Sequence, residues 1–428
     1  MQGTWKDFLQ TFGRIGLMSF GGPTAQIAVM HKILVEEKQW LSDSVFTHAL
    51  SFCMVLPGPE AMQLATYAGW RLRAERGGLL AGLLFVLPGA VVMLLLSALY
   101  AVYGGVVWVD AIFFGIKAAV LAIVIQALSR LAKRALRSLW HYIIAVLSFI
   151  GIFFFTLPFP ALIACAALVG FLTEPAPVQS PASSSSHATL SERSVSLRHT
   201  AGRALVWGSV WVAPLLGMMM ALGDQHLLVR LGLFFMQLAL VTFGGAYAVL
   251  AYMAQDVVSL HGWLDAGEMM TGLGLAETTP GPLILVTEYV GFLAAFKQGG
   301  VGAGLMGAGI ALWMTFAPCF LWIFTGGPYL EWIIARPRLK GALAAITAAV
   351  VGVIFNLSVW FAVHVFFDQV ETIKISVVTL LRPDLGTLNQ GVVVIALVSA
   401  VLLIGRAWSM GAVLAVASLL GLGWRILL

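Results

Sequence analysis

The chain has 428 residues, of which 60% are hydrophobic and only 10% are charged, and its formal net charge is +5. A soluble domain carries roughly 25% charged residues, so this composition excludes an ordinary soluble protein. Apolar segments of about 20 residues, the length of a membrane-spanning helix, recur along the chain, and the alternating pattern of a transmembrane β-barrel is absent. We predict an all-α polytopic membrane protein. The three cysteines stand singly in apolar stretches, which indicates neither disulfides nor a metal site.

The apolar segments fall into two groups separated by a polar stretch. The predicted first repeat, 1–172, contains segments 12–30, 45–70, 78–102, 106–129, 139–155 and 158–172. Residues 173–203 are rich in Ser, Pro and Ala, which predicts a flexible cytoplasmic linker. The predicted second repeat, 204–428, contains one unpaired helix at 205–222 and then segments 226–253, 268–296, 301–326, 341–367, 390–405 and 408–427. These make about thirteen transmembrane segments, of which 45–70 and 268–296 contain Pro-Gly-Pro and are either broken or re-entrant.

Basic residues cluster after the second, fourth and tenth segments and in the linker. If the N-terminus is cytoplasmic, simple alternation places every cluster on the cytoplasmic side, as the positive-inside rule requires. We therefore predict a cytoplasmic N-terminus and a C-terminus on the opposite side.

Two glycine-broken phrases repeat with an offset of 223 residues: SFGGPTAQIA at 19–28 and TFGGAYAVLA at 242–251. The same offset pairs the Pro-Gly-Pro at 57–59 with that at 280–282. The unpaired helix between the halves inverts the second repeat. Inverted-topology repeats with helices broken at matched positions are typical of secondary transporters, whose binding sites lie at the breaks.

The broken helices predict an anion site near the midplane, because helix N-termini present free N–H groups and partial positive charge. Thr278 and Thr279 precede the second Pro-Gly-Pro and can cap that helix or donate hydroxyls to the anion. The predicted substrate-binding residues are Arg14, Gly21, Gly22, Pro57, Gly58, Pro59, Gln63, Lys117, Gly244, Gly245, Thr278, Thr279, Pro280, Gly281 and Pro282.

Several charged candidates have alternative roles. Lys117 lies at depth, where a charge is a functional hypothesis, or it pairs with Asp110 seven residues away. Arg14 either contacts substrate or extends to the membrane surface. The carboxylates Glu60, Glu277 and Glu288 are candidates for proton coupling, although Glu60 at a helix start is also favoured by the helix dipole.

The paired phrases, together with LPGPEAMQLATYAGW and GLGLAETTPGPLILV, resemble the two halves of the chromate ion transporter (CHR) family. The resemblance covers nearly the whole chain except the linker. It implies a long-chain, two-domain member that exports chromate from the cytoplasm across the bacterial inner membrane and confers chromate resistance. Short members of half this length act in pairs. One departure is Glu288, where we expect an uncharged amide.

The sequence shows no nucleotide-binding motif, so we expect transport by alternating access, driven by membrane potential or a proton gradient. No cofactor, metal or nucleic acid partner is expected beside chromate and the lipid bilayer. Sulfate is an alternative, as a competitor or as the true substrate, because chromate and sulfate are both tetrahedral dianions. An anion channel is the alternative transport mode, and a homodimer is a possible assembly. An intramembrane enzyme requires clustered catalytic groups, and the sequence shows none.

Overall fold

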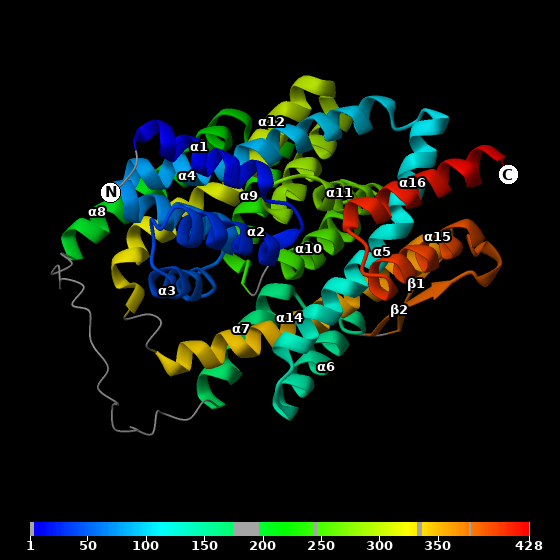
Figure 1. Cartoon of the computed structure of the whole chain (residues 1–428). Coiled ribbons are helices and arrows are strands. Elements are labelled where there is room, and N and C mark those ends of the chain that lie inside the picture. Colours follow the sequence, from blue (N-terminus) through cyan, green and yellow to red (C-terminus); the bar gives the residue numbers. More distant parts are fainter. Residues whose placement is uncertain (1–3, 174–196, 244–245, 332–335, 376–377, 428) are drawn as a thin grey trace.

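The structure is a computed structural model that describes residues 4–173, 197–243, 246–331, 336–375 and 378–427 (Figure 1). Nearly all of the described chain is helical, which confirms the predicted all-α class. The helices of the first half are α1 (Trp5–Met18), α2 (Gly22–His31), α3 (Asp43–Cys53), α4 (Glu60–Tyr103), α5 (Val107–Ala135), α6 (Leu139–Phe153) and α7 (Phe159–Thr173).

The second half repeats this order after one extra helix. Its helices are α8 (Leu197–Leu222), α9 (Leu227–Val241), α10 (Ala246–Gln255), α11 (Ala266–Thr278), α12 (Val286–Gly326), α14 (Pro337–Phe366), α15 (Gln390–Ala400) and α16 (Met410–Leu427). Short π- or 3-10-helical turns are η1 (Lys32–Glu37), η2 (Asp256–Leu260), η3 (Leu283–Leu285), η4 (Gly327–Tyr329), η5 (Leu385–Thr387) and η6 (Val401–Gly405).

By length and composition, five described helical stretches can cross a membrane. They are Glu60–Tyr103, Val107–Ala135, Arg198–Leu222, Leu283–Tyr329 and Arg338–Phe366. Six shorter apolar helices accompany them: Leu139–Phe153, Phe159–Thr173, Leu227–Val241, Val249–Leu260, Gln390–Gly405 and Met410–Arg425. The chain is therefore a polytopic membrane protein in which several helices are shorter than the hydrocarbon layer is thick.

The predicted linker 173–203 is shorter than the sequence suggests. Thr173 still belongs to α7, and α8 already begins at Leu197. Two interactions hold the first two turns of α8: an ion pair between Arg203 Nε and Glu75 Oε1 at 2.8 Å, and a hydrogen bond between the hydroxyls of Thr200 and Tyr329 at 3.1 Å. The rest of the linker lies outside the described residues.

The predicted segment 12–30 is broken where the glycines predict it. Helix α1 ends at Met18 and α2 begins at Gly22, while Gly21 between them has φ +81°. The matching break in the second half lies between α9 and α10, and Gly244 and Gly245 fall outside the described residues.

The second Pro-Gly-Pro forms the turn of a helical hairpin, which we call the second hairpin: α11, the second tip (Pro280–Pro282), η3 and the first arm of α12 up to residue 298. Its arms run antiparallel, because the Tyr289 hydroxyl donates to the Glu268 carbonyl at 3.0 Å across 21 residues. Helix α11 has 13 residues, about 20 Å of helix, which is too short to cross about 30 Å of hydrocarbon. Segment 268–296 is therefore a helical hairpin and not one continuous membrane-spanning helix.

The first hairpin has the same order of elements: α3, the first tip (Pro57–Pro59) and the first arm of α4 up to residue 72. The rings of Phe52 and Tyr67 from its two arms lie 6.3 Å apart. Each hairpin then continues into a longer arm through a sharp reversal, at Arg73 and Ala74 in α4 and at Gly299 and Gly300 in α12. The repeat is thus preserved in backbone conformation as well as in sequence.

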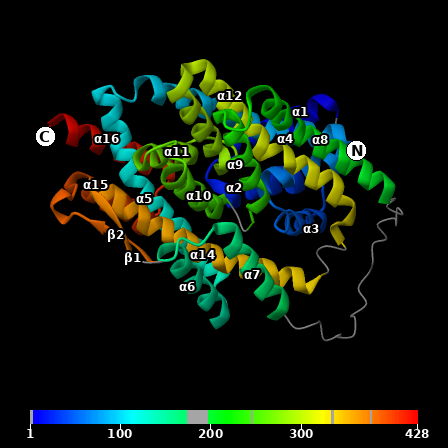
Figure 2. The ribbon, with the colours of Figure 1, turned by 180° about the vertical axis from the view of Figure 1, so that it is seen from behind.

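Helices α5 and α14 occupy matching positions in the two halves and pack against each other. Figures 1 and 2 show α14 beside α6 and α7, and they show the small β-hairpin close to α15. Its strands, β1 (Val370–Ile375) and β2 (Val378–Pro383), are antiparallel, with Val370 opposite Pro383. The Thr379 N–H joins this hairpin to the end of α6 by donating to the Phe154 carbonyl at 2.8 Å.

Candidate functional site

A cavity of about 560 Å³, the large cavity, lies between the first hairpin, α2, α5 and α14. It brings together four residues predicted from the sequence: Gly21, Gly22, Gly58 and Glu60. Its other lining residues are Pro23, Thr24, Ser51, Cys53, Met54, Val55, Leu56, Ala127, Arg130, Leu131, Arg134, Ala135, Arg137, His141, Leu339, Lys340, Leu343, Ala344 and Thr347.

The lining of the large cavity is strongly basic. Arg130 and Arg134 come from the last turns of α5, Arg137 follows two residues after its end, and Lys340 comes from the first turn of α14. Glu60 is the acidic side chain among the lining residues. This charge balance favours an anion, because clustered charge of one sign focuses the field in a cleft.

In the sequence these basic residues indicated only the orientation of the chain in the membrane, and their place in the site was not predicted. A signal was present, since Arg130 and Arg134 are four residues apart and therefore share one face of α5. The missing information was that the start of α14, more than 200 residues later, lies on the same cavity.

Two helix N-termini reach the large cavity without a side-chain cap. Gly21 precedes α2 and Pro59 precedes α4, and neither side chain can accept a hydrogen bond from the first turn. By contrast, Ser42 caps α3, and Asp265 and Glu268 form a capping box on α11. Uncapped N-termini leave N–H groups without intrahelical partners and carry partial positive charge, so they suit an oxyanion.

The two tips are bonded reciprocally to the broken helices of the opposite half. The Gly58 N–H donates to the Thr242 carbonyl at 2.8 Å, and the Gly281 N–H donates to the Ser19 carbonyl at 2.7 Å. Donor and acceptor are each related by the offset of 223 residues. The Gly58 N–H, which the sequence suggests as a ligand for the anion, is thus engaged with the other half.

Glycine is needed at both tips because φ is +121° at Gly58 and +86° at Gly281. Residues with a Cβ rarely adopt this region. The flanking prolines limit each tip to one sharp turn, and helices resume directly after them, as the sequence predicts.

Two buried glutamines hold carbonyl groups of the tips. Gln63 Nε2 donates to the Pro57 carbonyl at 2.7 Å within the first half. Gln26 Nε2 donates to the Gly281 carbonyl at 2.6 Å, from the first half to the second. The Oε1 atoms of both glutamines are buried without a hydrogen-bond partner. Gln26 was not predicted, and its position in the repeat is filled by Val249, so no pattern marked it.

The predicted residues around the second tip lie away from the large cavity. The Thr278 and Thr279 hydroxyls donate to the carbonyls of Leu275 and Ala276 in their own helix, at 2.8 and 3.0 Å. Pro280, Gly281 and Pro282 are buried. Glu277 lines a second, much smaller cavity of about 10 Å³.

Two predicted cations are also elsewhere. Arg14 forms an exposed ion pair with Glu37 at 2.9 Å. Lys117 is half-buried on α5 with its ammonium beside Gly267 at the start of α11. Asp110, the alternative partner of Lys117, lies 3.9 Å from the guanidinium of Arg425.

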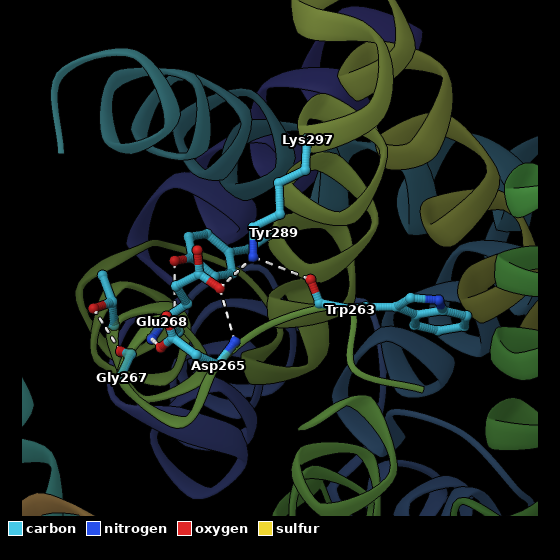
Figure 3. A network of polar contacts seen from close by, with 7 residues as sticks. Trp263, Asp265, Gly267, Glu268, Tyr289 and Lys297 are labelled. Carbon is cyan, nitrogen blue, oxygen red and sulfur yellow. Dashed lines mark hydrogen bonds and ion pairs between the residues drawn. The ribbon is translucent and has the colours of Figure 1, made fainter. Parts of the chain in front are cut away.

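A polar network closes the base of the second hairpin near Lys117 (Figure 3). Lys297 Nζ lies 2.6 Å from Glu268 Oε2 and donates to the Trp263 carbonyl at 3.2 Å. Glu268 also completes the capping box with Asp265. The network therefore fixes the start of α11 to the end of the first arm of α12.

The base of the first hairpin is tied differently. His31, at the end of α2, contacts Asp43 at 2.7 Å and Glu36 at 3.2 Å. The hydrogen bond to Asp43 is the main cause that raises the pKa of His31, and Glu36 adds to it. This pairing joins α2 to α3 rather than joining the two arms of the hairpin.

Glu288 is 1% exposed on the first arm of α12, and its Oε2 has no hydrogen-bond partner. A buried carboxylate in such surroundings is a functional candidate. Among the described residues, no group of three or more His, Cys, Asp or Glu side chains is placed to hold a metal ion.

Comparison with known proteins agrees with this architecture. The family model described as "Chromate transporter" matches residues 6–171 and 229–423, one stretch in each half. No solved structure matches the chain.

Curated relatives cover most of the chain. A "Chromate transport protein" of Cupriavidus metallidurans is 29% identical over 88% of this chain and 87% of its own length. One from Pseudomonas aeruginosa is 33% identical over 82% of this chain and 79% of its own length. A "Probable chromate transport protein" of Synechococcus elongatus is 30% identical over 82% of both chains. The chain therefore belongs to the chromate transporter family.

Proposed function

We propose that the protein exports chromate from the bacterial cytoplasm across the inner membrane and thereby confers chromate resistance. The observation that carries the proposal is the large cavity, in which two uncapped helix N-termini lie within one basic lining. The names of the relatives supply the substrate. Chromate is a tetrahedral dianion, and its four oxygens suit N–H donors and guanidinium groups that converge from several directions.

The basic residues around the large cavity support an opening to the cytoplasm. They combine two clusters, after the fourth and the tenth predicted segments, that the positive-inside rule assigns to the cytoplasmic side. In this orientation the N-terminus is cytoplasmic and the C-terminus periplasmic. A dianion that enters from the cytoplasm then meets arginines first and the helix N-termini deeper inside.

The driving force follows from the charge of the substrate. The membrane potential contributes about 2.3 kcal/mol per elementary charge per 100 mV, so it favours the outward movement of a dianion by about 4.6 kcal/mol per 100 mV. Proton exchange can add to this through Glu60, which lines the cavity. Ionised Glu60 repels the dianion and protonated Glu60 admits it. Glu277 and Glu288 are the further candidates for this role.

The test is uptake of radiolabelled chromate into everted membrane vesicles that contain the protein. We expect saturable accumulation of chromate that a protonophore abolishes. Excess sulfate should reduce this accumulation if the site recognises any tetrahedral dianion. Accumulation of sulfate alone contradicts chromate as the substrate. Flux that neither saturates nor shows counter-transport favours a channel.

A matched pair of variants ties the activity to the cavity. Arg134→Leu removes a guanidinium from the lining, whereas Arg14→Leu removes one that pairs with Glu37 outside the cavity. A charge-assisted hydrogen bond is worth about 1.5–3 kcal/mol, so Arg134→Leu raises the KM for chromate roughly 10- to 150-fold. An exposed ion pair contributes little, so Arg14→Leu keeps the wild-type KM. Equal KM values for the two variants contradict the assigned site.

A further inference from the structure

The position of Glu60 is unexpected in a cavity that binds a dianion. It is the acidic side chain among the residues that line the large cavity, and the same cavity is lined by Arg130, Arg134, Arg137 and Lys340. Arg134 is close enough for its charge to act on the Glu60 carboxylate. An ionised carboxylate at this place repels a bound dianion and so weakens its binding. The presence of Glu60 therefore needs a physical reason.

The first tip does not need a carboxylate in order to form. By the repeat, Glu60 corresponds to Leu283, because each residue directly follows a Pro-Gly-Pro tip. The two tips have a similar backbone, with φ −70° and ψ 106° at Pro59 and φ −65° and ψ 135° at Pro282. The second tip thus forms with a leucine at this position. The favourable interaction of a carboxylate with a helix N-terminus is therefore not what builds the turn.

The Glu60 carboxylate has acceptor sites left for a ligand. Within the described part of the chain, none of the ion pairs involves Glu60. The carboxylate accepts a hydrogen bond from its own backbone N–H, and two carboxylate oxygens together offer about four acceptor sites. A donor on a bound ion can therefore be recognised here.

Tetrahedral oxyanions differ in whether they carry such a donor. The last proton of chromic acid leaves near neutral pH, so hydrogenchromate is present in neutral solution beside chromate. The last proton of sulfuric acid leaves only in strong acid, so sulfate carries no proton. Shape and size separate the two ions poorly, whereas a site built to pair with a hydroxyl rejects an analogue that lacks it.

We propose that Glu60 selects chromate over sulfate by sharing one proton with the bound ion. This inference rests on the proposed transport function. Hydrogenchromate donates its hydroxyl to the ionised carboxylate, while the basic lining and the helix N-termini bind its other oxygens. The same complex is obtained when the chromate dianion meets protonated Glu60. Sulfate brings no proton, so it meets either a repelling carboxylate or a Glu60 that has first taken a proton from solution.

Other titratable groups face the same cavity. They are Cys53 at the end of α3, His141 in the first turn of α6, and the four basic side chains of α5, of the turn after it and of α14. Their charges act on every bound oxyanion in the same direction. The test therefore compares two oxyanions of equal charge at one pH, so that the proton on the ligand is the main difference between them.

The test is the affinity of the full-length protein in detergent for phosphate and for sulfate, measured by isothermal titration calorimetry in mildly alkaline buffer. Under these conditions both ions are tetrahedral dianions, and only phosphate carries a proton. We expect the wild type to bind phosphate roughly tenfold or more tightly than sulfate, which corresponds to one charge-assisted hydrogen bond. Equal affinities for the two ions overturn the proposal. This comparison needs no variant.

A matched pair of variants assigns the preference to Glu60. Glu60→Gln keeps the size of the side chain and removes its charge, so sulfate should bind roughly tenfold more tightly than in the wild type and the preference for phosphate should disappear. Glu37→Gln is the control, because Glu37 pairs with Arg14 outside the large cavity, and it should keep the wild-type affinities. A preference for phosphate that persists in Glu60→Gln contradicts the role of Glu60.

Titration of chromate in the same experiment separates this inference from the proposed function. A protein that prefers phosphate to sulfate through Glu60 but does not bind chromate refutes the substrate and keeps the role of Glu60. A protein that binds chromate but binds phosphate and sulfate equally refutes the role of Glu60 and keeps the substrate.

Discussion

Replacing Gly58 with alanine tests the first tip with the smallest possible change. Gly58 has φ +121°, so the backbone must adopt a strained conformation when a Cβ is added. The new Cβ would also lie 2.7 Å from Gln63 Nε2 and 3.1 Å from Cys319 Sγ. The Gln63 side chain must move, and its hydrogen bond to the Pro57 carbonyl is lost.

The size of the effect follows from these two costs. Backbone strain of this kind costs about 1–3 kcal/mol, and a lost hydrogen bond costs about 1 kcal/mol, which gives roughly 2–4 kcal/mol in total. If the tip must regain this geometry in every cycle, the transport rate falls roughly 30- to 1,000-fold.

The assay is the initial rate of chromate accumulation in everted vesicles, normalised to the amount of protein in the membrane. Gly13→Ala is the matched control, because Gly13 lies in α1 and no atom is within 4 Å of the added Cβ. A wild-type rate for Gly58→Ala at equal membrane content refutes the reasoning. A reduced rate for Gly13→Ala shows that the assay responds to glycine loss in general.

Three further predictions concern the contacts between elements. The hydrogen bond to Asp43 raises the pKa of His31, so the stability that His31 contributes is fully present below its ordinary pKa of 6.5 and is lost as pH rises through the folded pKa. The Tm of the wild type in detergent should therefore fall over this pH range, and the Tm of His31→Gln should not show this fall. The same pH dependence of Tm in both proteins contradicts the prediction. Lys297→Met breaks the ion pair with Glu268 and should lower the Tm, because the mostly buried Glu268 carboxylate loses its partner, whereas an unchanged Tm shows that this ion pair does not hold the base of the second hairpin. Gln26→Leu leaves the carbonyl of the second tip without its partner and should destabilise the protein by about 1–3 kcal/mol, measured as a lower Tm, whereas an unchanged Tm shows that the bond is not formed.

Local signals in the sequence predicted the helix breaks well. Glycine and proline act on the backbone of their own residues, so SFGG and Pro-Gly-Pro mark the ends of helices without any tertiary information. The antiparallel arrangement of the hairpin arms was left open, because it depends on contacts such as that between Tyr289 and Glu268, which are far apart in sequence.

The candidate site could be predicted only in part. Its glycines and Glu60 follow from the breaks, but the place of Arg14, Lys117 and the threonines before the second tip depends on how helices from both halves pack. The β-hairpin was also missed, although the alternation in Val370–Ile375 is typical of a strand. A short alternating stretch between long apolar segments is easily taken for a loop.

The reciprocal bonds between tips and broken helices join main-chain groups, so they place no demand on the side chains of Ser19 or Thr242. After a gene duplication, such a joint tolerates divergence of everything around it. The lining of the large cavity carries several arginines, whereas the main-chain bonds at the two tips are the same in both halves. Side-chain changes in either half can therefore alter the charge around the tips without breaking the joint between the two halves.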